Sequence, residues 1–202
     1  MKVYGDIISP FVRSCMVTAH EAGLADRVTL EKTAVKPDQV NQALQKLSPI
    51  GKIPVLETDH GHAVYDSRVI IEYLAHVSGN TSLIPDDGAK RFPALTLMAA
   101  AQGAADAAVA LRYEQAARPE DKRWPEYADR LKARILATLD DIEHNTAASL
   151  AAVNVGTICL ACMLGYIDFR HAYLTWREGR PKLSAFEKGF AARPSMKAWP
   201  LA

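Results

Sequence analysis

Ser9 and Pro10 stand where an apolar N-terminal segment gives way to a helical pattern, and a serine at such a point can do chemistry. Proline suits the first position of a helix and serine the N-cap before it, so we expect a helix to begin here. A helix N-terminus presents free N–H groups and about half a positive charge. A thiolate held there is stabilised, and a hydroxyl that donates a hydrogen bond to its sulfur adds to the effect. Ser9 is therefore either a thiol-activating residue or a simple helix cap.

A second segment, Ile53-Pro54, opens an apolar run that is typical of a strand. Proline cannot donate a ladder hydrogen bond, so it belongs at a strand start, a strand edge or a cis turn. A cis bond at this position would turn the N–H and C=O of Ile53 outward, where an extended peptide could pair with them by strand addition. Lys52 precedes this turn and is either a partner for a carboxylate or a solvated loop lysine.

A third segment, Asp66-Ser67, opens the next helical pattern. The N–H and hydroxyl of Ser67 at a helix N-terminus suit a bound carboxylate. A cap uses the same donors as an anion site, so the alternative interpretation of Asp66 and Ser67 is a plain helix cap.

The elements that must position these residues follow the order β-α-β-α-β-β-α in the first part of the chain. Periodicity and turn residues predict strands at 2–7, 28–32, 53–57 and 62–65 and helices at 11–22, 38–47 and 69–77.

Strand signals end at about Asp87, and four helices are expected at 89–117, 126–145, 154–173 and 183–193. Gly and two Pro make residues 80–93 the natural linker, so we predict an α/β domain at 1–79 and an all-helical domain at 94–202. Asn154 is a good cap for the apolar 154–173 helix. Thr157 stands where an acid would complete the capping box, which predicts a weakened cap.

The bulk composition excludes several classes of protein. Lys and Arg number 24 and Asp and Glu 23, so a net charge of +1 argues against nucleic acid or an anionic membrane as the main partner. No uninterrupted apolar run reaches the length of about 18 residues that a transmembrane helix needs. The N-terminus has no signal-peptide layout, and the odd count of 3 cysteines predicts a reduced, cytoplasmic protein without a disulfide framework.

The cysteines and histidines do not form a predicted metal or redox centre. Cys15 lies on the apolar face of the first helix and is expected in the core. Cys159 and Cys162 have C-x-x-C spacing inside an apolar helix without a second pair, so we expect core thiols rather than metal ligands. His60 and His62 flank a hairpin glycine, and no metal is predicted there.

With these three turns in this order, the chain resembles the cytosolic glutathione S-transferase superfamily over nearly its whole length. It looks closest to bacterial glutathione-transferase-like proteins with Ser-Pro-Phe-Val-Arg at the first turn, here 9–13, and Gly-Tyr-Ile-Asp-Phe-Arg late in the helical domain, here 165–170. The resemblance implies a thioredoxin-like α/β N-terminal domain, a cis Pro54, an all-α C-terminal domain and a cytoplasmic homodimer.

The resemblance also implies residue roles. Ser9 would donate to the sulfur of glutathione, which is itself the nucleophile, while Ile53 offers main-chain bonds and Lys52 faces the glycyl carboxylate. Asp66 and Ser67 would hold the γ-glutamyl end, and Phe11 and Val35 would line the edge of the pocket.

The helix at 89–117 supplies the remaining candidates. Arg112 and Tyr113 end it and are either part of a second-substrate pocket or a solvated helix end. Gln102 and Asp106 lie one turn apart on an alanine-rich stretch, where we expect a helix-to-helix contact in the dimer that reaches the partner's glutathione.

The leading hypothesis is a glutathione transferase that activates the glutathione thiol for attack on a small hydrophobic electrophile or a peroxide, a detoxification reaction. Two alternatives stay open: a non-catalytic binding or regulatory protein that reuses the fold, and a glutathione-dependent disulfide reductase. Ser9 stands where disulfide-exchanging relatives carry cysteine, which weighs against the reductase.

Overall fold

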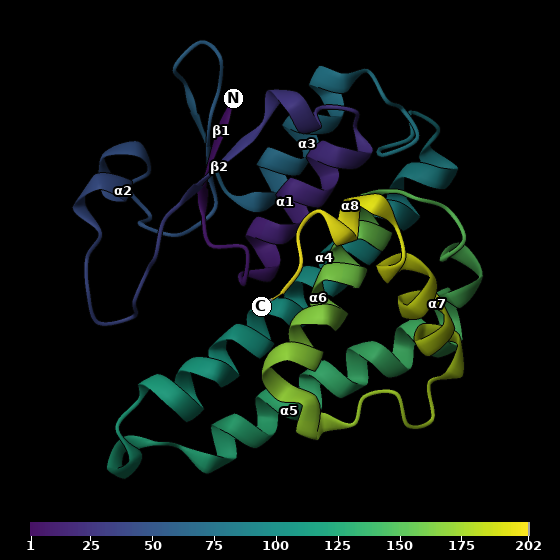
Figure 1. Cartoon of the computed structure of the whole chain (residues 1–202). Coiled ribbons are helices and arrows are strands. Elements are labelled where there is room, and N and C mark those ends of the chain that lie inside the picture. Colours follow the sequence, from purple (N-terminus) through teal and green to yellow (C-terminus); the bar gives the residue numbers. More distant parts are fainter. Residues whose placement is uncertain (202) are drawn as a thin grey trace.

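The computed structural model describes residues 1–201 and combines a small mixed sheet with a larger helical layer (Figure 1). The strands are β1 (Lys2–Gly5), β2 (Thr29–Lys32), β3 (Val55–Glu57) and β4 (Ala63–Val64), in the order β2-β1-β3-β4. β1 pairs parallel with β2 and antiparallel with β3, and Val3 faces Leu56 across that second ladder. The thioredoxin-like topology expected from the sequence is therefore confirmed.

Helices α1 (Pro10–Glu21) and α3 (Ser67–Ser78) pack together on one side of the sheet, and α2 (Gln42–Leu47) lies on the other (Figure 1). α2 is shorter than the predicted 38–47 helix because the cap is Asn41, whose side chain accepts a hydrogen bond from Leu44 N at 3.0 Å. Residues 36–39 form a tight bridged turn instead of the first helical turn.

The helical layer contains α4 (Gly88–Arg112), α5 (Pro125–Asp141), α6 (Val155–His171), α7 (Pro181–Ala191) and α8 (Pro194–Lys197). α4 and α5 run side by side as a long hairpin, and α6 packs against α4 in the middle of the layer (Figure 1). α4 continues into a π-helical turn at Tyr113–Ala117. It begins at Gly88, where Asp87 caps it, so residues 88–93 of the predicted linker are helical. The short α8 follows the last helix expected from the sequence.

The start of α6 corrects a second prediction. The Asn154 side chain accepts from Gly156 N and Thr157 N at 2.9 and 3.1 Å, and the Thr157 hydroxyl accepts from Asn154 N at 3.0 Å. The capping box is therefore complete, because a threonine hydroxyl takes the place of the carboxylate. The predicted weakening of the cap is wrong.

The two layers meet where α1 packs on α6, and this contact joins the two signature segments. The buried Arg13 donates from Nε to the carbonyl of Trp199 at 2.9 Å. A Cβ on Gly165 would lie 2.7 Å from the Arg13 guanidinium, so this glycine gives the arginine its room. The core residues of both layers form one continuous cluster.

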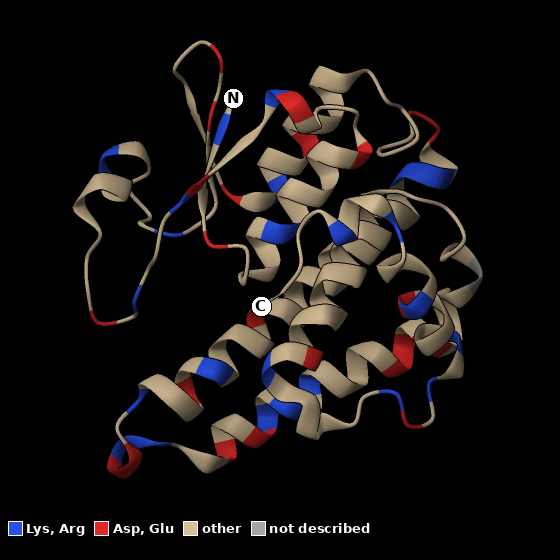
Figure 2. Ribbon diagram, viewed as in Figure 1, with Lys and Arg blue, Asp and Glu red and all other residues tan. Residues whose placement is uncertain are grey.

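Charges of both signs are mixed over both layers (Figure 2). One segment, Gly88–Ala117, has the length and composition of a helix that could cross a membrane. More than half of its most apolar window is buried, and the core helix of a soluble protein passes the same test.

Candidate functional site

Ser9 occupies the N-cap of α1, with its backbone in an extended conformation and its N–H bonded to Asp6 O at 2.9 Å. Its hydroxyl accepts a long hydrogen bond of 3.5 Å from Val12 N. Within residues 1–201 nothing accepts the proton of this hydroxyl, so it is available to a group in front of the helix. The site thus combines one uncommitted hydroxyl donor with the positive end of a helix of three turns.

The Ile53–Pro54 peptide bond is cis, as expected. Pro54 is buried, and β3 begins at the next residue. In the described part of the chain, neither the N–H nor the C=O of Ile53 has a backbone partner. This half-buried residue therefore offers both of its main-chain groups for strand addition.

A cavity of about 560 Å³ opens between the two layers and brings these groups together. Its N-terminal wall contains the predicted site residues Ser9, Phe11, Val35, Lys52 and Ile53.

The opposite wall of this cavity comes from the helical layer. α4 contributes Arg112 and Asp106, and the π-helical turn contributes Tyr113. Two further lining residues, Tyr166 and Arg170 on α6, were not singled out from the sequence as site residues. Tyr166 and Arg170 are four residues apart and therefore lie on one face of an otherwise apolar helix. This pair of polar residues is the feature of the sequence that could have identified them as site residues.

Asp66 and Ser67 lie at the N-terminus of α3, beside this cavity rather than in its lining. The Asp66 side chain accepts from Arg68 N at 3.0 Å and its carbonyl accepts from Ile70 N at 3.0 Å, so Asp66 is the N-cap. Asp66 therefore does cap α3, which was the alternative to a role in ligand binding. Capping does not conflict with ligand binding, because a helix N-terminus has several N–H groups.

Gln102 differs most from its expected position. Its side chain is 2% exposed in a single chain, so it lies inside the molecule and not on the surface where a dimer contact was predicted. It donates to the Ser67 hydroxyl at 3.4 Å and accepts from Arg68 Nε at 2.7 Å. Gln102 therefore links α4 to the start of α3 and holds Ser67 in place.

Asp106, one turn further along α4, is exposed and lines the cavity. Partial burial raises its pKa, while the charges of Arg68 and Lys52 act to lower it. Asp106 is therefore close enough to both Asp66 and Lys52, at the two predicted ends of the glutathione site, for their charges to affect it.

The three cysteines lie in the core, as predicted. Burial raises the pKa of Cys159 to about 12 and that of Cys162 to about 11, and it raises the pKa of Cys15 as well. A thiol needs a lowered pKa to react at neutral pH, so these residues are packing groups. Residues 1–201 contain no cluster of three or more His, Cys, Asp or Glu arranged to hold a metal.

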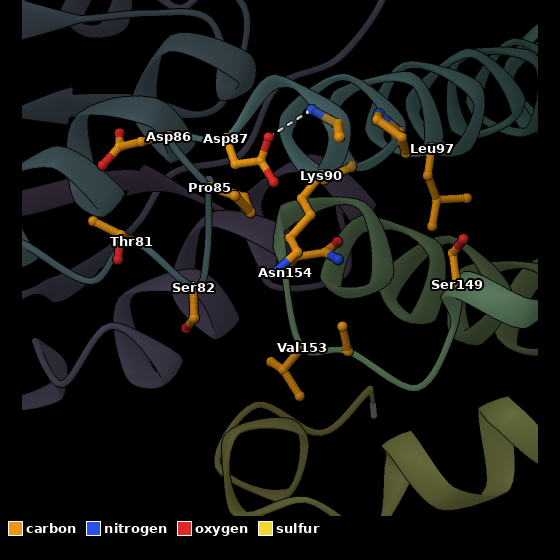
Figure 3. Close-up of a pocket in the computed structure, with 14 residues that line it drawn as sticks. Thr81, Ser82, Pro85, Asp86, Asp87, Lys90, Leu97, Ser149, Val153 and Asn154 are labelled. Atoms are coloured by element: carbon orange, nitrogen blue, oxygen red, sulfur yellow. Dashed lines mark hydrogen bonds between the residues drawn. The ribbon is translucent and has the colours of Figure 1, made fainter.

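A second cavity, of about 770 Å³, lies between the 80–87 segment, the first turns of α4 and the loop before α6 (Figure 3). Asp87 in its wall is already bonded to Ala89 N at 3.0 Å as the cap of α4 (Figure 3). This cavity is larger than the one at Ser9. It lacks the convergence of a helix-end hydroxyl with a free main-chain edge, so we place the functional site at the smaller cavity.

Comparisons with known proteins identify the family of the chain. Residues 8–77 match the family model described as glutathione S-transferase, N-terminal domain. The GST-like protein YibF of Escherichia coli, itself uncharacterized, is 30% identical over 198 residues, which is 96% of each chain. The chain belongs to the glutathione S-transferase superfamily.

Solved members of this superfamily resemble the chain along its whole length. A glutathione transferase family member from Pseudomonas fluorescens Pf-5, with bound glutathione, is 40% identical, covers 99% of both chains and superposes with a TM-score of 0.95. A second structure of a Pf-5 family member holds S-(propanoic acid)-glutathione, at 39% identity, full coverage of both chains and a TM-score of 0.90. A glutathione S-transferase from Methylobacillus flagellatus, with glutathione bound, is 28% identical at a TM-score of 0.86, covering 100% of this chain and 99% of the other.

Proposed function

We propose that this protein is a glutathione transferase that binds glutathione across the cavity between its two layers and activates the thiol for attack on a small electrophile. The observation that carries the proposal is the meeting of two groups on one cavity: the Ser9 hydroxyl with its uncommitted proton, and the unpaired main chain of Ile53. The glutathione bound by the Pseudomonas relative at 40% identity supports the same ligand here.

Each part of glutathione has a partner of suitable chemistry. The cysteinyl main chain would pair with Ile53 next to cis Pro54, and the glycyl carboxylate would face Lys52. The γ-glutamyl carboxylate would bind at Ser67 and the N-terminus of α3, with Asp66 taking the ammonium group. Phe11 and Val35 supply apolar contacts at the edge.

This pose would leave the sulfur at the N-terminus of α1. There the Ser9 hydroxyl donates a hydrogen bond to the thiolate, and the helix end adds a favourable field. The thiolate then attacks the electrophile, while Ser9 remains unmodified. Arg112 and Tyr113 form part of the second-substrate wall, and by family resemblance the active species is a cytoplasmic homodimer with Asp106 on its dimer-facing side.

Two other functions use the same fold. A binding or regulatory protein would hold glutathione without turnover. A disulfide reductase would need a reactive cysteine, and the buried position of all three cysteines weighs against it.

Turnover assays with reduced glutathione separate these functions. The protein is offered an electrophilic halide, an organic peroxide and a small disulfide in parallel, each with unsubstituted protein and with Ser9→Ala. Conjugation or peroxide reduction that falls at least about tenfold in Ser9→Ala supports the transferase. Turnover of the disulfide alone would identify a reductase, and binding without any turnover would identify a binding protein.

A further inference from the structure

The helical wall of the cavity carries an unusual polar group in Tyr166 of α6. Tyr166 as a residue is only 4% exposed, but its hydroxyl is not a fully buried atom, and no hydrogen bond to it is found within residues 1–201. Because Tyr166 lines the cavity, this hydroxyl can donate its proton to a ligand bound there.

Two arginines flank this hydroxyl. Arg112 reaches the cavity from the last turn of α4, and Arg170 from the residue one turn after Tyr166 on α6. Both half-buried side chains lack a salt bridge to any carboxylate among residues 1–201, although Arg170 stacks on the ring of Phe169 at 4.5 Å. By contrast, Arg177 on the neighbouring surface is paired with both Asp168 and Glu187.

Both arginines act electrostatically on the hydroxyl of Tyr166. Burial raises the pKa of Tyr166 to about 12, and Arg170 and Arg112 both act to lower it. The hydroxyl is therefore protonated at neutral pH and can only donate to an anion. The same two arginines lower the pKa of the adjacent His171, after burial as the main cause, so this imidazole adds no positive charge beside the hydroxyl at neutral pH.

The acidic residues of the cavity do not neutralise this region. The Asp6 carboxylate is bonded to Ile8 N at 3.0 Å. Asp106 interacts with the charges of Arg68 and Lys52 at the other end of the cavity, where glutathione would lie. Two cations and one neutral donor thus line the second-substrate end, and neither cation forms a salt bridge with a carboxylate in the described part of the chain.

We propose that the second substrate is an anionic electrophile, whose carboxylate is held by Arg112, Arg170 and the Tyr166 hydroxyl. This inference rests on the proposed transferase function and replaces the small hydrophobic electrophile expected from the sequence. A short chain bearing a carboxylate at one end and a halide at the other fits the chemistry. The thiolate forms the carbon–sulfur bond, and the carbon–halogen bond breaks as halide leaves with the electron pair.

A matched pair of product analogues tests the inference without turnover. Reduced glutathione, S-carboxyethyl-glutathione and its neutral amide S-carbamoylethyl-glutathione are titrated into the unsubstituted protein by calorimetry. The two analogues differ only in the charge at the end of the S-substituent. We expect the acid to bind about tenfold or more tightly than the amide, as charge-assisted hydrogen bonds imply.

Three variants then locate the preference. Arg112→Gln and Arg170→Gln each bring the ratio of acid to amide affinity close to one, and Tyr166→Phe reduces it by a smaller factor. Arg134→Gln removes an exposed arginine of α5 that lies outside the cavity lining, and it keeps the ratio of the unsubstituted protein.

The possible results are distinguishable. Equal affinity for acid and amide, with glutathione bound, overturns the inference and leaves the transferase proposal intact. A preference for the acid that persists in both arginine variants also overturns it. Failure of glutathione and both analogues to bind overturns the transferase proposal itself. If one arginine variant fails to fold, the other arginine variant and Tyr166→Phe still locate the preference.

Discussion

Replacing Ser9 by alanine should raise the pKa of the bound glutathione thiol while barely changing the stability of the protein. The two effects are separate because the hydroxyl caps the helix as a hydrogen-bond acceptor and stabilises the thiolate as a hydrogen-bond donor. As an acceptor it makes only the 3.5 Å hydrogen bond to Val12 N, at the weak limit of the usual geometry. Loss of a good serine cap costs about 1 kcal/mol, so we expect about 0.5 kcal/mol or less here.

As a donor, the hydroxyl would make a hydrogen bond to a charged sulfur. Such a bond contributes about 1.5–3 kcal/mol, and each pKa unit corresponds to about 1.4 kcal/mol. The thiol pKa in the complex should therefore rise by about one to two units in Ser9→Ala. The positive end of α1 remains in the variant, so the pKa should still lie below that of free glutathione.

The assay follows the ultraviolet absorbance of the thiolate in the binary complex as a function of pH, together with urea unfolding of the free protein. Ser14→Ala is the matched control, because Ser14 lies in the same helix and its hydroxyl donates to Pro10 O at 2.7 Å. An unchanged thiol pKa in Ser9→Ala would refute the donor role. A loss of stability above about 1 kcal/mol would instead show that Ser9 acts mainly as a cap.

Three further predictions concern packing, pH and thiol exposure. Gly156→Ala should lower the free energy of unfolding by about 1–3 kcal/mol, because its Cβ would lie 2.6 Å from the fixed carbonyl of Ala94. Gly103→Ala, in open space on α4, should raise it by up to about 1 kcal/mol, and equal effects in urea unfolding would contradict this argument. The hydrogen bond from Arg193 lowers the pKa of Glu21 in the folded protein. The interaction therefore stabilises the protein fully above the ordinary carboxyl pKa of about 4, and this stabilisation is lost as the pH falls through the lower pKa of the folded state. Glu21→Gln should therefore be less stable than the unsubstituted protein at neutral pH and equally stable in strong acid, as measured by urea unfolding at each pH. A difference in the free energy of unfolding that persists in strong acid would show that ionisation of Glu21 is not its cause. Finally, the three buried cysteines should resist an aromatic disulfide reagent in the native protein and react fully in denaturant, and a rapidly reacting native thiol would contradict their burial.

Local signals made much of the fold predictable. Ser9-Pro10 and Asp66 fix the starts of α1 and α3 because a side-chain acceptor and a preset proline act within one helical turn. The start of α2 was missed because Asp38 and Asn41 are both good caps. Only the tight turn at 36–39 decides between them in favour of Asn41.

The composition of the cavity was harder to predict, since it depends on how the two layers pack. α6 is apolar on nearly every face, so its sequence does not tell which face lines the cavity with Tyr166 and Arg170. For Gln102, by contrast, the sequence suggested a surface position, whereas the structure buries the side chain. A polar side chain on an alanine-rich helix suggested a surface contact, but α3 lies across it and takes its hydrogen bonds.

Calorimetric titration of reduced glutathione tests the central claim most directly. The proteins compared are the unsubstituted protein, Ser67→Ala and, as a control with the same substitution, Ser149→Ala in the second cavity. We predict micromolar to low-millimolar binding to the unsubstituted protein and to Ser149→Ala, and a loss of about tenfold or more in Ser67→Ala, because Ser67 would bind the γ-glutamyl carboxylate. No binding to the unsubstituted protein at several millimolar, or a loss in Ser149→Ala instead of Ser67→Ala, would contradict the glutathione site described above.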